Sequence, residues 1–285
     1  MNRKLQKYAS CAVVAATMAL STACGNKHAA ADSAESNLTV KEITWEDSIA
    51  VNDCTAKSEV SVAYPADGNQ ALLDSTRLWI AQTLMTTIPV DTAAVDTTFS
   101  SKALADGEKL VADAGKRFLT EADNDFRSFD SNDGFSFNYG YQAEINKGFS
   151  TDSVVTFNSS TYIYTGGAHG ATLVNGATFR TSDGAVLGYE IFNPNALPEL
   201  TQMVKDALSK QYFEGDDDFK MEDALIIDPQ DFRLPANPPY FTDKGVTFIY
   251  QQYEIACYAA GLPTCTLPYA DIAPLLLPAY RPLLP

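Results

Sequence analysis

Histidine is scarce in this sequence, and the motifs of the common enzyme classes are missing. The 285 residues include only two histidines, His28 and His169. A multi-histidine metal site is therefore excluded. A Ser-His-Asp or Cys-His catalytic arrangement could use only His169, because His28 lies in an N-terminal stretch of small and polar residues. The sequence also lacks a G-x-S-x-G elbow, a P-loop, a zincin motif and a dinucleotide fingerprint. We accordingly expect no catalytic residue, no metal and no cofactor.

Positive charge is scarce as well. Lysine and arginine total 20 against 36 aspartates and glutamates, which gives a formal net charge of -16. Such a surface repels phosphate backbones, so nucleic-acid binding is disfavoured. A cationic partner is easier to attract, although an acidic surface is also a common device for solubility. The hydrophobic share of 46% is enough for one large domain or two small ones.

The N-terminus has the three parts of an export signal. Arg3, Lys4 and Lys7 precede an apolar stretch from residue 9 to residue 20, which ends at the small residues 21–23. The apolar stretch is shorter than the roughly 20 residues that a membrane span needs. We therefore predict a signal peptide at residues 1–23 and an exported protein.

Cys24 follows this signal in a pattern that resembles the lipobox of bacterial lipoproteins. Ala23 precedes the cysteine and Gly25 follows it, while Ser21 stands where that family most often has leucine. The resemblance implies acylation of Cys24 and a lipid anchor in the cell envelope, at the outer membrane, on its periplasmic or surface-facing side. An ordinary secretory signal with an incidental cysteine is the alternative. Residues 24–44 are predicted to be a flexible tether, and no later segment is apolar enough to span a membrane.

Hydrophobic spacing predicts an α+β fold. Helical periodicity occurs at Leu73–Leu84, Leu104–Phe118 and Leu197–Leu208. Alternating patterns predict strands at Ser58–Tyr64, Phe135–Ile145, Val155–Tyr164, Phe179–Leu187 and Val246–Cys257, with a hairpin turn at 182–184 and phase slips that indicate bulges before Tyr162 and Tyr253. Because strands follow strands directly, we expect antiparallel sheets packed with about three helices, in an N-terminal segment 45–150 and a C-terminal segment 151–285.

The cysteines allow two disulfide pairings. Cys11 leaves with the signal and Cys24 is assigned to lipid, so Cys54, Cys257 and Cys265 remain. Two of the three are expected to pair in an oxidising compartment. Cys257 and Cys265 flank an expected turn at 261–264, which makes local closure one pairing, and Cys54 with Cys257 is the other.

A glycine-rich turn is the sharpest local feature. Gly166, Gly167 and Gly170 surround His169 at the end of an aromatic strand. Exposed amides there could form an anion-binding nest; alternatively the glycines only turn the chain and the imidazole bonds to nearby carbonyls. Two acidic runs, 123–134 and 214–223, hold oxygens suited to calcium, but the first departs from EF-hand spacing, and solvated loops are the preferred interpretation of both.

Three blocks of the sequence resemble a known family, the extracytoplasmic domain of the anti-sigma factor RsiV, which also occurs beside the catalytic domain of the peptidoglycan deacetylase PdaC. The blocks are Tyr162–Gly170, Phe179–Phe192 and Phe248–Tyr269. The resemblance implies an α+β fold. RsiV-like members bind lysozyme and release a sigma factor after proteolysis, and the deacetylase members use the domain as an accessory. Without a transmembrane helix or a deacetylase domain here, we expect neither signalling by that route nor deacetylation.

The resemblance and the acidic charge together favour a non-enzymatic binding module of the cell envelope. A basic, lysozyme-like protein or peptidoglycan is the expected ligand, because opposite charge steers encounter. The residues expected to contact it lie in the glycine-rich turn and at the rim of the last hairpin: Gly166, Gly167, His169, Tyr253, Glu254 and Tyr258. A cell-wall hydrolase that uses carboxylates or His169, and a structural component of an envelope complex, are the alternatives.

Overall fold

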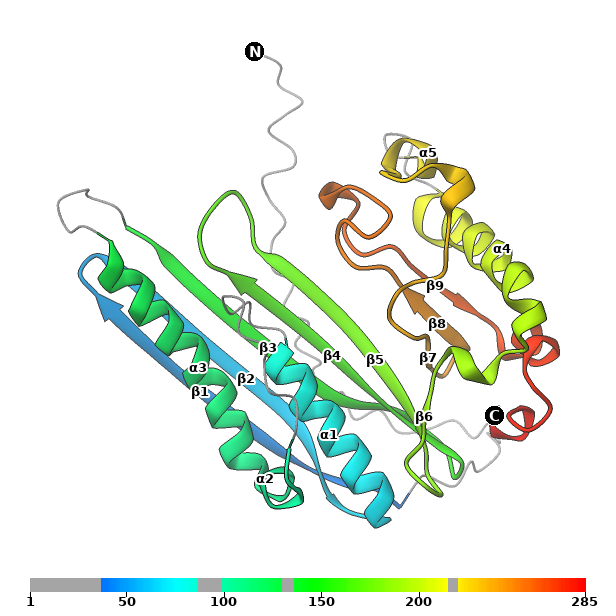
Figure 1. The fold of residues 1–285 in the computed structure, drawn as a ribbon, viewed down its shortest axis with the longest axis horizontal. Helices are drawn as coiled ribbons and strands as arrows, with labels where there is room; N and C mark the ends of the chain where they lie inside the picture. Colours follow the sequence, from blue (N-terminus) through cyan, green and yellow to red (C-terminus); the bar gives the residue numbers. More distant parts are fainter. Residues whose placement is uncertain (1–36, 87–98, 130–135, 215–219) are drawn as a thin grey trace, which may run out of the picture. The chain divides into compact units, whose positions relative to one another are not determined.

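Six strands form the first and larger sheet. The computed structural model describes residues 37–86, 99–129, 136–214 and 220–285, so the signal peptide, Cys24 and the first part of the expected tether lie outside the described residues. The strand order is β1-β2-β3-β4-β5-β6 (Figure 1). The strands are Thr39–Val51, Cys54–Asp67, Asn138–Ser150, Val154–Tyr164, Ala171–Arg180 and Val186–Leu187.

Three helices lie on one face of this sheet: α1 (Gln70–Thr86), α2 (Ser101–Ala105) and α3 (Gly107–Ser128) (Figure 1). The helical pattern expected from residue 104 to residue 118 is broken at Asp106, whose carboxylate accepts a hydrogen bond from the backbone amide of Lys109 and so caps α3. The apolar faces of α1 and α3 and the inward-facing residues of the strands form one hydrophobic core. Among the described residues, no helix is long and apolar enough to cross a membrane.

A second sheet follows in the chain and has its own core. It consists of β7 (Tyr240–Phe241), β8 (Val246–Ile249) and β9 (Thr264–Leu267), all antiparallel. Helix α4 (Leu197–Leu208) packs against β9. Short helices α5 (Met221–Ala224) and α6 (Tyr269–Ile272) complete this part. The mixed α+β class, with sheets that are mainly antiparallel and three main helices, is confirmed.

One pair of strands departs from the expected antiparallel pairing. β2 and β3 run parallel, with Ser58 opposite Tyr141, while the other neighbours are antiparallel. Parallel strands need a long crossover connection, and the segment that contains α1, α2 and α3 provides it. The expectation of antiparallel pairing therefore fails at this one pair of strands.

The N-terminal limits predicted for the tether and the segments need correction. β1 begins at Thr39, so residues 39–44 belong to the sheet and not to a flexible tether. Ile43, Trp45 and Ile49 face the helices. Asp47 interrupts the alternation of apolar residues, so the sequence pattern did not predict this strand. The expected boundary at 150/151 falls in the turn between β3 and β4, which are paired, so it does not separate the two sheets.

The two predicted bulges are also absent from the described strands. β4 keeps one register against β5 along its length. The sequence suggested a phase change because the buried face carries the polar residues Ser159 and Thr161, while Tyr162 lies on the other face. The register break lies instead between β3 and β4, at Lys147 to Ser150. Residues 250–263, expected to continue a strand past Tyr253, form a loop between β8 and β9.

Candidate functional site

Two loops that are distant in sequence meet at the surface and bring the expected site residues together. His169 lies in the β4–β5 loop, and Tyr253 and Tyr258 lie in the β8–β9 loop. The rings of His169 and Tyr258 stack with centroids 3.7 Å apart and planes 19° apart. The hydroxyl of Tyr258 donates to the carbonyl oxygen of Gly170 at 2.9 Å, and the hydroxyl of Tyr253 lies 3.4 Å from Nε2 of His169.

Side-chain amides hold the β8–β9 loop against the edge of β5. The Gln251 amide donates to the carbonyl oxygen of Val174 at 2.8 Å and accepts from the Val174 amide at 3.2 Å. Gln252 accepts from the Thr172 amide at 3.0 Å. β6 pairs with β5 only at residues 178 and 179, so the two glutamines satisfy backbone groups that a neighbouring strand would otherwise bind. The position of Tyr253 is thus fixed by contacts with the first sheet.

Glu254 supports the loop through both of its carboxylate oxygens. One carboxylate oxygen accepts from the Ala236 amide at 2.6 Å and the other from the Gln251 amide at 2.8 Å. Charge-assisted bonds of this kind are about twice as strong as neutral ones. Burial, with a smaller contribution from the negative charge of Glu254, raises the pKa of Tyr189. Glu254 therefore belongs to the framework behind the surface.

Tyr253 has an unusual backbone conformation. Its φ is 65°, in the left-handed region, and its side chain is 55% exposed. For a residue other than glycine this conformation costs roughly 1–2 kcal/mol. Such strain persists where the surrounding contacts determine the backbone, and it concentrates at functional sites. The contacts of Gln251, Gln252 and Glu254 hold the backbone on both sides of the strained residue.

The glycines of the other loop turn the chain under His169. Gly166 has φ 95° and Gly167 has φ 86°, and the hydroxyl of Tyr164 donates to the Gly167 carbonyl oxygen at 3.0 Å. A nest alternates right-handed and left-handed residues, so this pair of left-handed glycines is not itself the expected anion-binding nest. The glycines act here as a turn that presents His169 to solvent.

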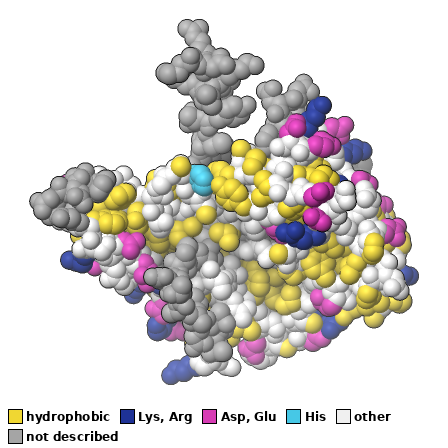
Figure 2. Space-filling model, turned by 45° about the horizontal axis from the view of Figure 1, so that its top comes forward, with side chains coloured by type: hydrophobic (Ala, Val, Ile, Leu, Met, Phe, Trp, Pro, Cys, Tyr) yellow, Lys and Arg dark blue, Asp and Glu magenta, His cyan; other side chains and the backbone are white. Residues whose placement is uncertain are grey.

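Tyr162 joins this surface, although its alternation in the sequence indicated only a strand residue. It is 40% exposed, and a Cβ added at Gly170 would lie 2.5 Å from its ring, so the ring rests directly on Gly170. We call Tyr162, His169, Tyr253 and Tyr258 the aromatic shelf. In Figure 2 the histidine lies beside hydrophobic side chains, with the charged side chains farther away. The phase change after Phe157 was the signal that could have found Tyr162.

His169 has a hydrogen-bonding neighbour near each of its two ring nitrogens. Nδ1 lies 3.2 Å from the carbonyl oxygen of Gly170, which can only accept, so Nδ1 carries the proton if that bond forms. Nε2 lies 3.4 Å from the hydroxyl of Tyr253. Within the described ranges, no group of three or more histidine, cysteine or acidic side chains is placed to hold a metal ion.

The predicted disulfides are not formed in the described part of the chain. Cys54 lies on β2 in the first core, while Cys265 lies on β9 in the second. Cys257 and Cys265 are both free, which contradicts both pairings. The Cys265 thiol donates to the carbonyl oxygen of Val204 at 3.7 Å, and burial raises its pKa to about 12. Cys265 acts as a small core residue.

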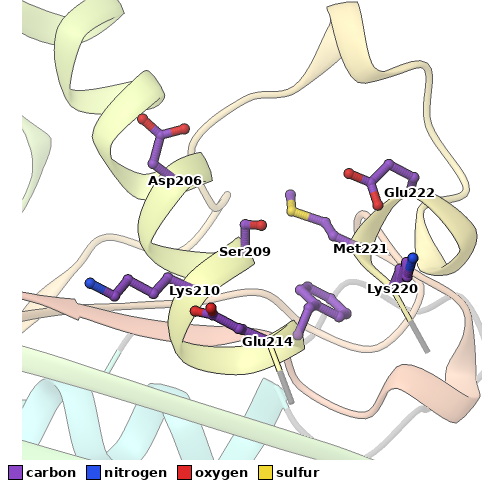
Figure 3. Close-up of a pocket in the computed structure, with 8 residues that line it drawn as sticks. Asp206, Ser209, Lys210, Glu214, Lys220, Met221 and Glu222 are labelled. Carbon is purple, nitrogen blue, oxygen red and sulfur yellow. The ribbon is translucent and has the colours of Figure 1, made fainter. Parts of the chain in front are cut away.

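Apart from the aromatic shelf, a hollow lies at the end of α4, where a π-helical turn, Ser209–Phe213, continues the helix (Figure 3). Its volume is about 470 Å³. Phe213 and Met221 are buried residues that line it. Ser209 and Glu222 lie on either side of Met221 (Figure 3). The other residues around it are Asp206, Lys210, Glu214 and Lys220. Carboxylates and amines both line the hollow, so its charges give no preference for an anionic or a cationic ligand.

Part of the chain matches the model of a described family. Residues 189–270 match the family described as "Protein of unknown function (DUF3298)". The matched range contains Tyr253 and Tyr258, whereas Tyr162 and His169 lie before it. A comparison with curated protein sequences finds no match.

Two crystal structures of DUF3298 proteins are similar along most of the chain. One, from Bacteroides fragilis, has a TM-score of 0.60 and 18% identity, and covers 86% of this chain and 96% of its own. The other, from Pseudomonas aeruginosa, has a TM-score of 0.55 and 15% identity, and covers 88% and 98%. At such identity the likeness concerns the fold alone. The chain thus contains a DUF3298 match over residues 189–270 and has structural neighbours in that family.

Proposed function

We propose that this protein is a non-enzymatic binding module of the bacterial cell envelope and that the aromatic shelf is its binding surface. The observation that carries the proposal is the meeting of two loops, which exposes Tyr253 in a strained conformation beside His169 and Tyr258. Exposed aromatic side chains are typical of recognition surfaces, because they combine a large apolar area with a polar tip. The expected ligand is a basic, lysozyme-like protein or peptidoglycan.

The environment of His169 favours binding over hydrolysis. Both ring nitrogens lie near partners in the structure, the Gly170 carbonyl oxygen and the Tyr253 hydroxyl. In a Ser-His-Asp arrangement a carboxylate orients the imidazole and a serine hydroxyl donates to it, whereas the neighbours of the His169 ring are a backbone carbonyl and a phenol. Glu254, the carboxylate of the same loop, is already bonded to two backbone amides. These contacts support a recognition role for the surface.

Export and acylation are part of the same proposal. They rest on the signal pattern at residues 1–23 and on Cys24, and the resemblance to RsiV-like domains supports the envelope as the place of action. A fatty-acid label fed to cells that express the full chain should appear on the protein, and Cys24→Ser should remove it. A label that persists in Cys24→Ser would contradict lipidation at this position.

Binding is tested with the mature Cys24→Ser chain, which cannot be acylated there. Calorimetry with lysozyme at low and moderate salt, and co-sedimentation with purified sacculi, measure the two expected ligands. We expect binding in at least one of the two assays. If lysozyme gives no heat at micromolar concentration and no protein sediments with sacculi, the proposed function is wrong.

A further inference from the structure

Three rings of the aromatic shelf, those of His169, Tyr253 and Tyr258, have similar orientations. The plane of Tyr258 makes angles of 19° with His169 and 35° with Tyr253, whose centroid is 5.9 Å away. Tyr162 continues the surface on the other side of Gly170, whose carbonyl oxygen Tyr258 binds. A ligand that presents a flat face of C–H groups fits such rings, because the face of an aromatic ring carries partial negative charge.

The shelf contains no carboxylate, lysine or arginine. Glu254, next to Tyr253 in the chain, uses both oxygens within the loop. The formal charge of the whole chain is -16, which repels polyanions. A nucleic acid or a phosphate-rich polymer therefore has no cation on the shelf to bind, and an uncharged ligand fits better.

Hydrogen-bonding side chains continue from the shelf along the face of the sheet that is opposite the helices. Tyr162 is opposite Gln142 on β3 and Thr172 on β5, and the next residue on that face, Ser160, is opposite Glu144. Gln142, Glu144 and Ser160 are exposed. Gln142 donates to Glu59 through its nitrogen, which leaves its oxygen as an acceptor. Hydroxyl groups of a ligand that extends past Tyr162 would meet these side chains.

The strain at Tyr253 agrees with a role for its exposed ring. The left-handed backbone costs roughly 1–2 kcal/mol, and more than half of the side chain remains in solvent. A glycine would adopt this φ at no steric cost. The Tyr253 side chain contacts His169 and Tyr258 within the chain, and its exposed part is available to a ligand.

We propose that the aromatic shelf binds an uncharged glycan, with one pyranose ring stacked on Tyr253 and the following sugars directed over Tyr162 toward Gln142 and Ser160. A pyranose has a face of C–H groups and a rim of hydroxyls, which matches aromatic rings next to amide and hydroxyl side chains. This inference rests on the proposed function, since it names the ligand class of the same surface.

The test uses N-acetylglucosamine oligomers of two to four units as probes. The mature Cys24→Ser chain is titrated by calorimetry, and saturation-transfer NMR identifies the sugar protons in contact. We expect affinity to rise with oligomer length and to fall at least tenfold in Tyr253→Gly, which removes the ring and relieves the strain. Tyr253→Phe keeps the ring and should bind within a few-fold of the parent.

Val186→Ala is the matched control. Val186 is also an exposed apolar residue, 47% exposed, but it pairs with Phe179 at the end of β5 away from the shelf. It should bind like the parent, and urea midpoints establish that each variant is folded. No oligomer binding at millimolar concentration, or equal binding by Tyr253→Gly, overturns the glycan inference. If lysozyme or sacculi still bind in that case, the proposed function stands; if nothing binds, both fail.

Discussion

Replacement of Tyr253 by glycine and by alanine tests the geometry of the aromatic shelf through stability alone. Both changes remove a ring that is 55% exposed and both lose the same contacts with His169 and Tyr258. They differ in the backbone, because at φ 65° alanine keeps a strain of roughly 1–2 kcal/mol that glycine does not have. At an ordinary position alanine is more stable than glycine by about 0.4–1 kcal/mol, chiefly because glycine has a more flexible unfolded state.

The order of the two variants should therefore be reversed at this position. We expect the free energy of unfolding of Tyr253→Gly to exceed that of Tyr253→Ala by about 1 kcal/mol. With a urea m-value of about 1–3 kcal/mol/M, the two midpoints would differ by about 0.3–1 M. The measurement is urea unfolding followed by circular dichroism. If the alanine variant is as stable as the glycine variant or more stable, Tyr253 is not left-handed and the loop is not built as described.

Four further predictions concern the framework and its titration. A Cβ at Gly115 on α3 would lie 2.0 Å from the Trp45 ring, so Gly115→Ala should lose about 1–3 kcal/mol despite a helix-propensity gain of about 1 kcal/mol; an unchanged urea midpoint would argue against this packing. Because burial raises the pKa of Cys265 to about 12, its thiol should not react with a disulfide reagent at pH 8 until the chain unfolds, and peptide mapping that finds it modified in the folded protein would refute its burial. Burial also raises the pKa of Tyr64 to about 12. In the unfolded chain the Cys265 thiol loses its proton near pH 9 and the Tyr64 phenol near pH 10, so the stability of the folded protein should fall as the pH rises from about 9 to 12. A urea midpoint that stays constant over that range would contradict both shifts. The side chain of Arg180, with the Ala185 amide, lowers the pKa of Asp183 to about 2. Ionised Asp183 therefore contributes fully to stability above about pH 4, and this contribution is lost as the pH falls toward 2. The urea midpoint of Asp183→Asn should lack this part of the acid dependence.

Much of the fold follows from local patterns, and the failures have physical causes. The helical stripes that contain Ile80, Phe118 and Val204 all lie in helices, because spacing near 3.6 residues places apolar side chains on one face. The second stripe is divided between α2 and α3 at Asp106. β1 was missed because Asp47 interrupts its alternation. The parallel pairing of β2 with β3 depends on contacts across a long crossover, which no local pattern encodes.

The candidate site shows a similar limit. His169, Tyr253 and Tyr258 could be named from their motifs, but not their contact, which depends on how Gln251 and Gln252 bind the edge of β5. Glu254 was expected to contact a ligand, and its bond to the Ala236 amide, 18 residues away in the chain, could not be predicted from a local pattern. Cys257 and Cys265 are close in sequence but do not form a disulfide: Cys265 is buried on β9, where its thiol donates to the Val204 carbonyl oxygen, and Cys257 lies in the β8–β9 loop.

The central claim is that the aromatic shelf is the binding surface of an envelope module. Co-sedimentation with purified sacculi, with lysozyme calorimetry in parallel, tests it most directly when the parent chain, Tyr253→Gly and Val186→Ala are compared at equal concentration and equal folded fraction. The account predicts that the parent and Val186→Ala bind alike and that Tyr253→Gly loses most of its binding to whichever ligand the parent binds. Equal binding by all three proteins would contradict it.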